Sequence, residues 1–154
     1  MLRIAAVSLL VLGLHGCGVG LDPEEIPVSL QGYEEWNKVE PLLGAVGGHG
    51  DTYRIMYRND EARRYTGAGE YPLGSAIVKE IYEVNGDGSA GELLYIATMR
   101  RIDEAAAPDL PIRGGWLFTQ IDGPVGDTEI HKDLCWDSCH RQAPFQGAWF
   151  DHSE

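Results

Sequence analysis

The stretch Ser75-Ala76-Ile77-Val78-Lys79-Glu80-Ile81-Tyr82-Glu83-Val84 decides the fold, together with the Asn85-Gly86-Asp87-Gly88 that follows it. The first run is rich in isoleucine, valine and tyrosine, which favour β-strands. The Asn-Gly-Asp-Gly sequence is typical of the tight turn of a β-hairpin. Residues 93–101 then form the predicted return strand. Both of its alternating faces, Leu94/Ile96/Thr98 and Leu93/Tyr95/Ala97/Met99, are apolar enough to predict a central strand that is covered on both sides.

Further runs extend this hairpin into a sheet. Residues 52–58 alternate, with Tyr53, Ile55 and Tyr57 on one face and Arg54, Met56 and Arg58 on the other, and residues 114–121 form another predicted strand. Short helices are predicted at 32–39 and at 60–65, the second capped by Asn59. The pattern predicts an α+β fold: a mostly antiparallel β-sheet of four or more strands with short helices.

Length and charge limit the function. The chain has 154 residues, enough for one compact domain, and a formal net charge of −12. A surface with this charge repels phosphates, which argues against nucleic acid and against electrostatic docking on anionic lipid. A basic protein partner suits it better.

The N-terminus predicts an export signal. Arg3 precedes an apolar run at 4–14, which is too short to span a bilayer well, and the run ends in Leu14-His15-Gly16-Cys17. This ending resembles a bacterial lipobox, so residues 1–16 are a predicted lipoprotein signal peptide and Cys17 the predicted lipid carrier. An ordinary secretory signal is the alternative. Residues 17–30 are then a tether and 31–154 the domain, held on the periplasmic side of the cell envelope. No Asp follows Cys17, which favours the outer membrane over the inner.

The strongest chemical motif is Cys135-Trp136-Asp137-Ser138-Cys139-His140. A cysteine pair followed at once by histidine is the arrangement that attaches a c-type haem, with the thiols bonded to the macrocycle and the imidazole to the iron. The usual spacing leaves two residues between the cysteines, and here there are three. If the segment is helical, the sulfurs at i and i+4 share one face and can both reach the haem.

Three other interpretations of this motif stay open: a small disulfide loop, a thiol redox pair, or zinc. His131, Cys135 and Cys139 are spaced four apart, so one helix would align them, although ligands on one helix do not converge tetrahedrally. The redox pair would need a βαβ setting that the chain lacks. The aromatic residues near the motif could wall a large apolar cofactor. They are Trp136, Phe145, Trp149 and Phe150.

Lys79 and two histidines also need explanation. Lys79 shares a strand face with Ile77 and Ile81, so it is either an edge residue that reaches water or a residue directed at a ligand. His49 lies in a Gly-rich loop, where we expect a solvated side chain, with a distal iron ligand as the alternative. His131 is expected on a helix surface.

Several motifs in order resemble the cytochrome P-460 and cytochrome c′-β family, including a lipoprotein branch with three residues between the cysteines. The resemblance covers about residues 31–152. It rests on Gly32-Tyr33-Glu34-Glu35-Trp36, Arg54-Ile55-Met56-Tyr57, Asn59-Asp60, Tyr71-Pro72-Leu73-Gly74-Ser75, Ile77-Val78-Lys79-Glu80, Ile96-Ala97-Thr98-Met99-Arg100, Gly115-Trp116, the Cys-His motif and the aromatic tail.

This resemblance implies a fold, a cofactor and roles for individual residues. A haem c would be held against the sheet by a C-terminal attachment helix, often in a homodimer, with His140 as the proximal iron ligand. Lys79 matches the lysine that bonds to the haem in hydroxylamine-oxidising members, and Arg54 matches an arginine near the haem. Both are therefore candidates for cofactor binding and catalysis.

One departure separates this chain from the hydroxylamine-oxidising members. Their distal carboxylate would fall near Ile96, and nothing acidic lies between Glu92 and Asp103. The resemblance therefore implies an apolar distal pocket, with Arg54, Tyr57 or Tyr95 as the remaining polar candidates. We expect a lipid-anchored cytochrome for redox or for binding small nitrogen oxides or other neutral gases. A hydroxylamine-oxidising enzyme is the second hypothesis and a non-haem envelope module the third.

Overall fold

The structure is a computed structural model that describes residues 26–42, 45–46, 49–122, 128–131 and 134–149. The predicted signal peptide, Cys17, Phe150 and His152 lie outside the described residues. Among the described residues, no helix combines the length and the apolar character needed to cross a bilayer.

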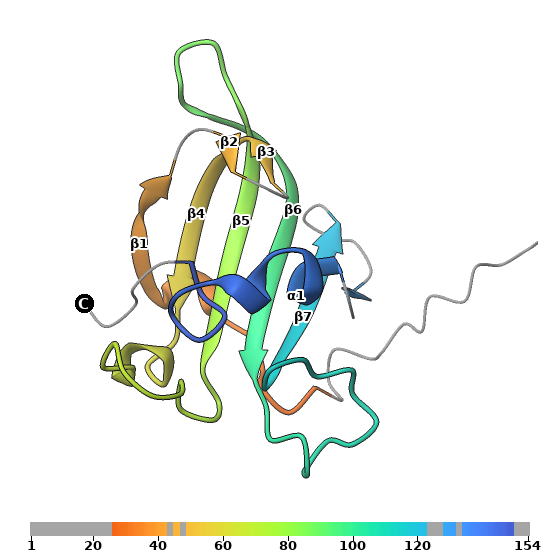
Figure 1. Ribbon diagram of the computed structural model, residues 1–154. Helices are drawn as coiled ribbons and strands as arrows, with labels where there is room; N and C mark the ends of the chain where they lie inside the picture. The colour runs from red at the N-terminus through yellow and green to blue at the C-terminus, as the bar shows by residue number, and fades with distance from the viewer. Residues whose placement is uncertain (1–25, 43–44, 47–48, 123–127, 132–133, 150–154) are drawn as a thin grey trace, which may run out of the picture.

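The described residues form an antiparallel sheet of six strands in the order β1-β4-β5-β6-β7-β8, so the predicted α+β class is confirmed (Figure 1). Its strands are β1 (Asn37–Leu42), β4 (Tyr53–Arg58), β5 (Ala76–Val84), β6 (Ala90–Arg101), β7 (Trp116–Asp122) and β8 (Thr128–Ile130). A two-stranded sheet pairs β2 (Ala45–Val46) with β3 (Gly50–Asp51). The helical elements are α1 (Leu134–Ser138) and the short 3-10 turns Tyr33–Glu35, Ala62–Arg64 and His140–Gln142.

Both helices predicted in the first half of the chain are wrong in extent. The first is a 3-10 turn at Tyr33–Glu35, after which the chain enters β1 and pairs with β4, Lys38 opposite Tyr57. Pairing along an otherwise open strand edge outweighs the weak helical pattern there. The second shrinks to Ala62–Arg64. Its N-cap residue is Glu61, although the Oδ1 of Asn59 does accept from the backbone N–H of Ala62 at 2.9 Å.

The pleat of the sheet separates two faces. We call the face with Ile77, Lys79 and Ile81 the front face; it lies toward the viewer in Figure 1, under the C-terminal segment. On this face Met56 and Ala97 flank Lys79 on the neighbouring strands. The predicted alternation of β5 and β4 is confirmed.

The predicted alternation of β6 side chains between the two faces is interrupted in the first half of the strand. Tyr95 pairs with Ile81, but Leu93 pairs with Tyr82, so Leu94 is an extra residue in the strand. This β-bulge moves Leu93 to the back face, where it packs with Ile96 instead of sharing a face with Tyr95.

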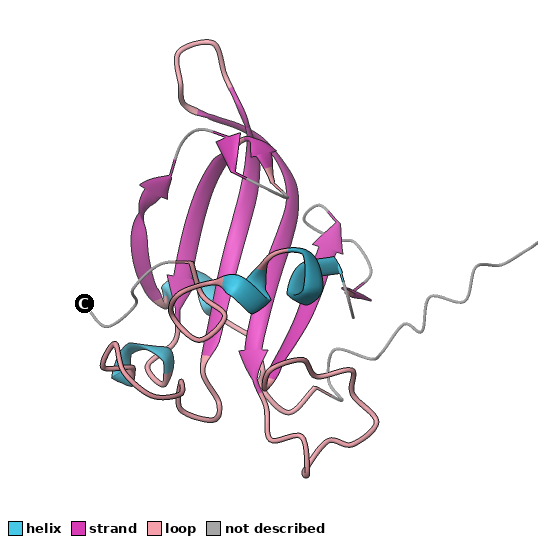
Figure 2. Ribbon diagram, in the orientation of Figure 1, coloured by secondary structure: helices cyan, strands magenta, loops and turns pink. Residues whose placement is uncertain are grey.

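The front-face core anchors the C-terminal segment. Cys135, Trp136 and Phe145 pack against a buried cluster that includes Trp116 and Phe118. The Trp116 indole Nε1–H also donates to the carbonyl oxygen of Gln146 at 2.8 Å. Figure 2 shows the resulting helical turns lying across the front of the strands.

The back face is covered by the start of the described chain. Ile26 is buried, and Val28 packs beside it against Leu117. Arg100 donates from Nη1 to the Val28 carbonyl at 3.1 Å, and the Arg100 side chain itself is buried. The last residues of the stretch assigned to a tether, from Ile26 onward, therefore pack against the sheet.

A buried carboxylate organises the back face. Glu80 accepts hydrogen bonds from the hydroxyls of Tyr33 and Tyr82 at 2.8 Å each and of Tyr57 at 3.2 Å. Burial and the charge of Glu80 raise the pKa of Tyr57 to about 12. The phenols therefore stay protonated and act as donors, and together they replace the water that the carboxylate loses.

Replacing Glu80 tests this arrangement. Glu80→Ala leaves three partly or fully buried hydroxyls without their acceptor, so we expect the free energy of unfolding to fall by about 3 kcal/mol in urea denaturation. Glu83→Ala, on the same strand but exposed, is the matched control and should change it by less than about 0.5 kcal/mol. Equal effects from the two substitutions would contradict the proposed role of Glu80.

Candidate functional site

A cavity of about 340 Å³ lies between the front face and the C-terminal segment. Its apolar lining comes from Ile77, Ala97, Met99, Phe118 and Leu134. Its titratable lining residues are His49, Lys79, Tyr95, His131, Cys135, Cys139 and His140. The structure therefore brings the predicted attachment residues together with Lys79, from a strand more than fifty residues away.

Both cysteines of the motif face this cavity. Cys135 lies in α1, and Cys139 follows the last residue of that helix. Both are half-buried free thiols. Burial raises the pKa of the Cys135 thiol, and the neighbouring Cys139 adds to the effect. The thiols thus line the cavity from one side, as attachment to a shared cofactor requires.

The helix predicted to align His131 with the cysteines is shorter than expected. His131 lies at the end of β8, where its backbone N–H donates to Phe118 at 3.2 Å, and α1 begins only at Leu134. The predicted helical alignment is therefore wrong, although His131 still lines the cavity. Among the residues that the structure describes, no group of three or more His, Cys, Asp or Glu side chains is arranged to hold a metal ion. The zinc interpretation gains no support from this geometry.

His140 is held in a defined tautomer. Its Nδ1 lies 2.6 Å from the carbonyl oxygen of Gly147, and because a carbonyl only accepts, Nδ1 carries the proton. The lone pair is then on Nε2, the nitrogen available to a metal. The ring packs beside Phe118, with centroids 4.9 Å apart. Burial lowers the pKa of His140, which keeps the imidazole neutral.

Gly147 is required for this contact. Its φ of 93° lies in the left-handed region, and an added Cβ would lie 3.1 Å from the Trp116 indole. Glycine therefore lets the turn approach Trp116 closely and present its carbonyl to His140.

The predicted aromatic wall is wrong for Trp136, Phe145 and Trp149, and Phe150 lies outside the described residues. Trp136 and Phe145 pack into the front-face core and do not line the cavity, and Trp149 is 44% exposed. The aromatic ring of the wall comes instead from Phe118 on β7. The position of Phe118 follows from the strand register, in which it pairs with Met99 on the front face.

The least expected feature is a hydrogen-bonded cluster of His49, Lys79 and Tyr95. The Lys79 Nζ lies 3.2 Å from His49 Nε2, and the Tyr95 hydroxyl lies 2.9 Å from His49 Nδ1. Burial, followed by the charges of Lys79, His140 and Arg54, lowers the pKa of His49 to about 4. Burial and the charge of Arg54 lower the pKa of Lys79 to about 8. The expectation that His49 is solvated is therefore wrong, and Lys79 points into the cavity.

Arg54, which was predicted to lie near the haem, lies close to the cavity but outside its lining. Arg54 is buried on the front face opposite Ile81 and donates to the Thr52 hydroxyl at 3.4 Å, but it does not line the cavity. Burial lowers the pKa of its guanidinium.

Ile96 does not face the cavity, so its predicted distal position is wrong. It lies in the back-face core with Tyr57 and Val78, which also removes Tyr57 from the polar candidates. The β6 residue beside Lys79 is Ala97. No carboxylate lines the described part of the cavity.

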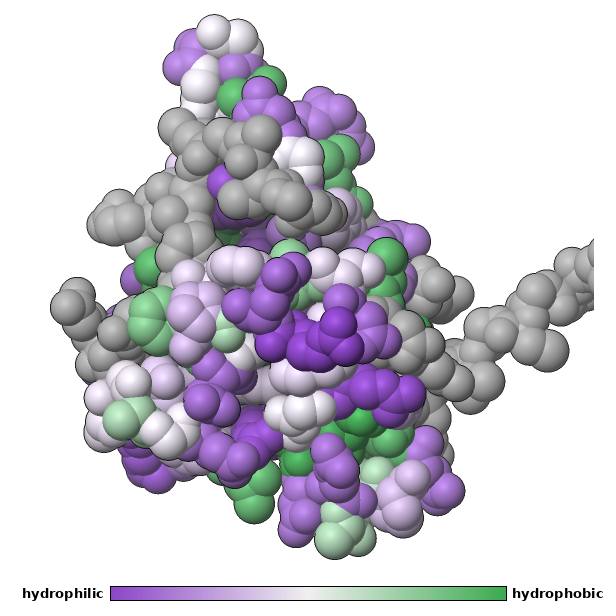
Figure 3. All heavy atoms as spheres, in the orientation of Figure 1, coloured by the Kyte–Doolittle hydropathy of each residue, from purple (hydrophilic) through white to green (hydrophobic). Residues whose placement is uncertain are grey.

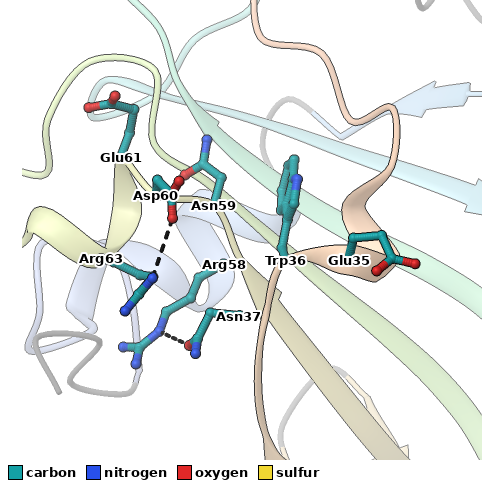
Figure 4. Close-up of a pocket in the computed structure, with 8 residues that line it drawn as sticks. All are labelled: Glu35, Trp36, Asn37, Arg58, Asn59, Asp60, Glu61 and Arg63. Carbon is teal, nitrogen blue, oxygen red and sulfur yellow. Dashed lines mark hydrogen bonds and ion pairs between the residues drawn. The ribbon is translucent and has the colours of Figure 1, made fainter.

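Two other surface hollows lack this chemistry. One lies beside Trp36 and is bordered by the contacts Arg58–Asn37 at 2.7 Å and Arg63–Asp60 at 3.4 Å (Figure 4). The other lies beside Glu70 and Arg101, which pair at 2.7 Å. Neither contains a cysteine or a histidine.

The outer surface of the C-terminal segment is mostly hydrophilic in Figure 3, in keeping with the exposed Asp137, Arg141 and Gln142. Of the apolar side chains that line the cavity, Ile77, Met99 and Phe118 are buried, whereas Leu134 is 67% exposed. The C-terminal segment therefore covers the cavity and presents a mostly hydrophilic outer surface.

A sheet that carries a lysine on its front face, covered by a Cys-His segment over a largely apolar cavity, is the arrangement expected of a haem-binding cytochrome. The family model described as Cytochrome P460 matches residues 30–150, and the chain belongs to that family. The resemblance of the sequence motifs to the cytochrome P-460 family is thereby confirmed. Family membership favours haem over the disulfide and zinc interpretations of the cysteines. Comparison with curated protein sequences returns no match.

The lowered pKa of His49 predicts an acid-sensitive fold. The unfolded chain binds a proton at His49 near pH 6.5, whereas the folded chain resists it until about pH 4, so the free energy of unfolding should fall as pH drops from 6.5 to 4. The free energy of unfolding is measured with urea at pH 7.0 and at pH 4.5. Its decrease between the two pH values should be smaller in His49→Leu than in the wild type, by about 1–2 kcal/mol. His131→Leu is the control from the same cavity. An unchanged pH dependence in His49→Leu would refute the burial of a neutral imidazole.

Proposed function

We propose that this chain is a c-type cytochrome that binds one haem covalently through Cys135 and Cys139, with His140 as the proximal iron ligand. Its role would be redox or the binding of small nitrogen oxides or other neutral gases. The observation that carries the proposal is the 2.6 Å contact between His140 Nδ1 and the Gly147 carbonyl, which leaves Nε2 free for iron.

The described residues fit such a cofactor. Two free thiols and an imidazole with a defined lone pair border one cavity, and the opposite wall is formed by Ala97, Met99 and Phe118. An apolar wall excludes water from a macrocycle, and the thiols fix its position. A haem bound there would supply a redox-active iron able to bind a further small ligand.

Location and partners extend the same proposal. The lipobox-like Leu14-His15-Gly16-Cys17 supports a lipid anchor on the periplasmic side of the envelope, with the outer membrane favoured. The net charge of −12 supports a basic redox protein as partner.

Oxidation of hydroxylamine is a second candidate function. It is favoured by one observation, the position of Lys79 in the cavity, where the family's hydroxylamine-oxidising members have a lysine bonded to the haem. A carboxylate that could act as general base is missing from the described cavity lining. The first function therefore has the stronger support.

Haem attachment can be measured directly. We expect protein made in a host with haem-attachment machinery to keep its haem after denaturation and to give a c-type pyridine haemochrome spectrum. Cys135→Ala/Cys139→Ala should lose the haem on denaturation, because no thioether bond remains. Asp137→Ala, between the two cysteines and exposed, is the control and should retain it. Wild-type protein without any haem would refute the proposed function.

The role of Lys79 separates the two candidates. We expect little or no turnover when hydroxylamine and an electron acceptor are added, because the described cavity lining has no carboxylate. Lys79→Ala should keep its haem, since the cysteines anchor it, with Lys38→Ala as the exposed control. A strongly red-shifted Soret band in the wild type together with rapid turnover would support the enzyme instead. Loss of haem in Lys79→Ala would contradict the assigned roles.

A further inference from the structure

The cluster of Lys79, His49 and Tyr95 has hydrogen-bond donors that no described residue accepts. An ammonium only donates, so the 3.2 Å contact makes His49 Nε2 the acceptor from Lys79. A neutral imidazole then carries its proton on Nδ1, which donates to the Tyr95 oxygen at 2.9 Å. Two N–H groups of Lys79 and the O–H of Tyr95 remain, and within the described residues neither side chain has another hydrogen-bond partner.

The electrostatics of the cavity add to this requirement. Lys79 is a half-buried cation, and its hydrogen-bond partner His49 is an uncharged ring. No carboxylate lines the cavity where it is described, and the buried guanidinium of Arg54 adds positive charge nearby. A buried charge without a counter-ion is costly, so an anion that enters here is stabilised.

We propose that Lys79, held by His49, and Tyr95 form a subsite for a small oxyanion at the edge of the haem cavity. The ammonium and the phenol donate to the oxygens of the guest, while His49 positions both groups. The chemistry of the guest is that of a carboxylate or of nitrite: planar, singly charged and rich in acceptors. This gives the cavity a polar corner beside the apolar wall of Ala97 and Met99.

This inference rests on the proposed function, because the cofactor defines the rest of the cavity. Two sources supply such an oxyanion. One is a carboxylate of the haem itself, and the other is a free ion such as nitrite. The same donors would serve either guest. The two sources are distinguished by whether the variants change the nitrite affinity or the midpoint potential.

The test uses full-length, haem-loaded protein and the variants Lys79→Met and Tyr95→Phe. Nitrite affinity of the ferric protein is measured by titration of the Soret band, carbon monoxide affinity of the ferrous protein serves as the neutral-ligand reference, and the midpoint potential is recorded. Lys38→Met and Tyr53→Phe are matched controls outside the cavity. Pyridine haemochrome and thermal unfolding verify that each variant is loaded and folded.

If the guest is a free ion, both cavity variants weaken nitrite binding about tenfold or more and leave carbon monoxide affinity within about twofold. If the guest is a haem carboxylate, nitrite affinity stays unchanged, but both variants lower the midpoint potential because that carboxylate loses a donor. Either result supports the subsite.

The subsite is refuted if Tyr95→Phe changes neither the nitrite affinity nor the midpoint potential. A change of midpoint potential in Lys79→Met alone does not support it, because the lost charge of the lysine is enough to explain that change. Failure of the proposed function looks different: the wild type then holds no haem. In that case calorimetric titration of the haem-free wild type and Lys79→Met with nitrite decides the subsite alone. Binding that Lys79→Met weakens supports it, and no binding, or equal binding by both, refutes it.

Discussion

The pairing of β5 with β6 is the constraint on which the rest of the structure depends. Because successive side chains of a strand point to opposite faces, Lys79 and Glu80 are adjacent in sequence but lie on different sides of the sheet. Glu80 gathers three tyrosine hydroxyls on the back face. Lys79 points into the front cavity. A shift of one residue in this register would bury the lysine among the tyrosines and direct the acid into the front cavity, so the register sets the sign of charge in the proposed haem site.

Much of this arrangement could be predicted from the sequence because it follows local rules. The Asn-Gly turn, the period-two alternation of Tyr53 to Arg58 and the face shared by Ile77 and Lys79 depend on residues close together in the chain. The Cys-His motif could be recognised for the same reason. The family inferred from ordered motifs agrees with the match over residues 30–150. Local periodicity gave a wrong prediction where pairing with a distant strand prevails. Residues 37–39 were predicted to be helical, but they form a strand that pairs with β4.

The parts that could not be predicted are contacts between distant segments. Nothing near His49 in the sequence reveals that Lys79 and Tyr95, thirty and forty-six residues away, will meet its two ring nitrogens. The orientation of Ile96 depends on the register of β6, and an ungapped match does not specify a strand face. Trp136 and Phe145 were expected to line a cofactor because they are near its attachment residues. They stabilise the cover instead, and Phe118 forms the aromatic wall.

The distal side inferred from sequence was apolar, and the proposed subsite adds a polar corner to it. The described lining of the cavity has no carboxylate, so it lacks both a general base and a counter-ion for the half-buried Lys79. His49 does not compensate for the charge, since burial keeps its ring neutral, and both ring nitrogens already have partners. An iron bond to His49 would break one of these contacts and would leave the lysine without its acceptor. Retaining the cluster therefore favours an open iron position with hydrogen-bond donors beside it, an arrangement better suited to binding a small polar ligand than to electron transfer between two fixed axial histidines.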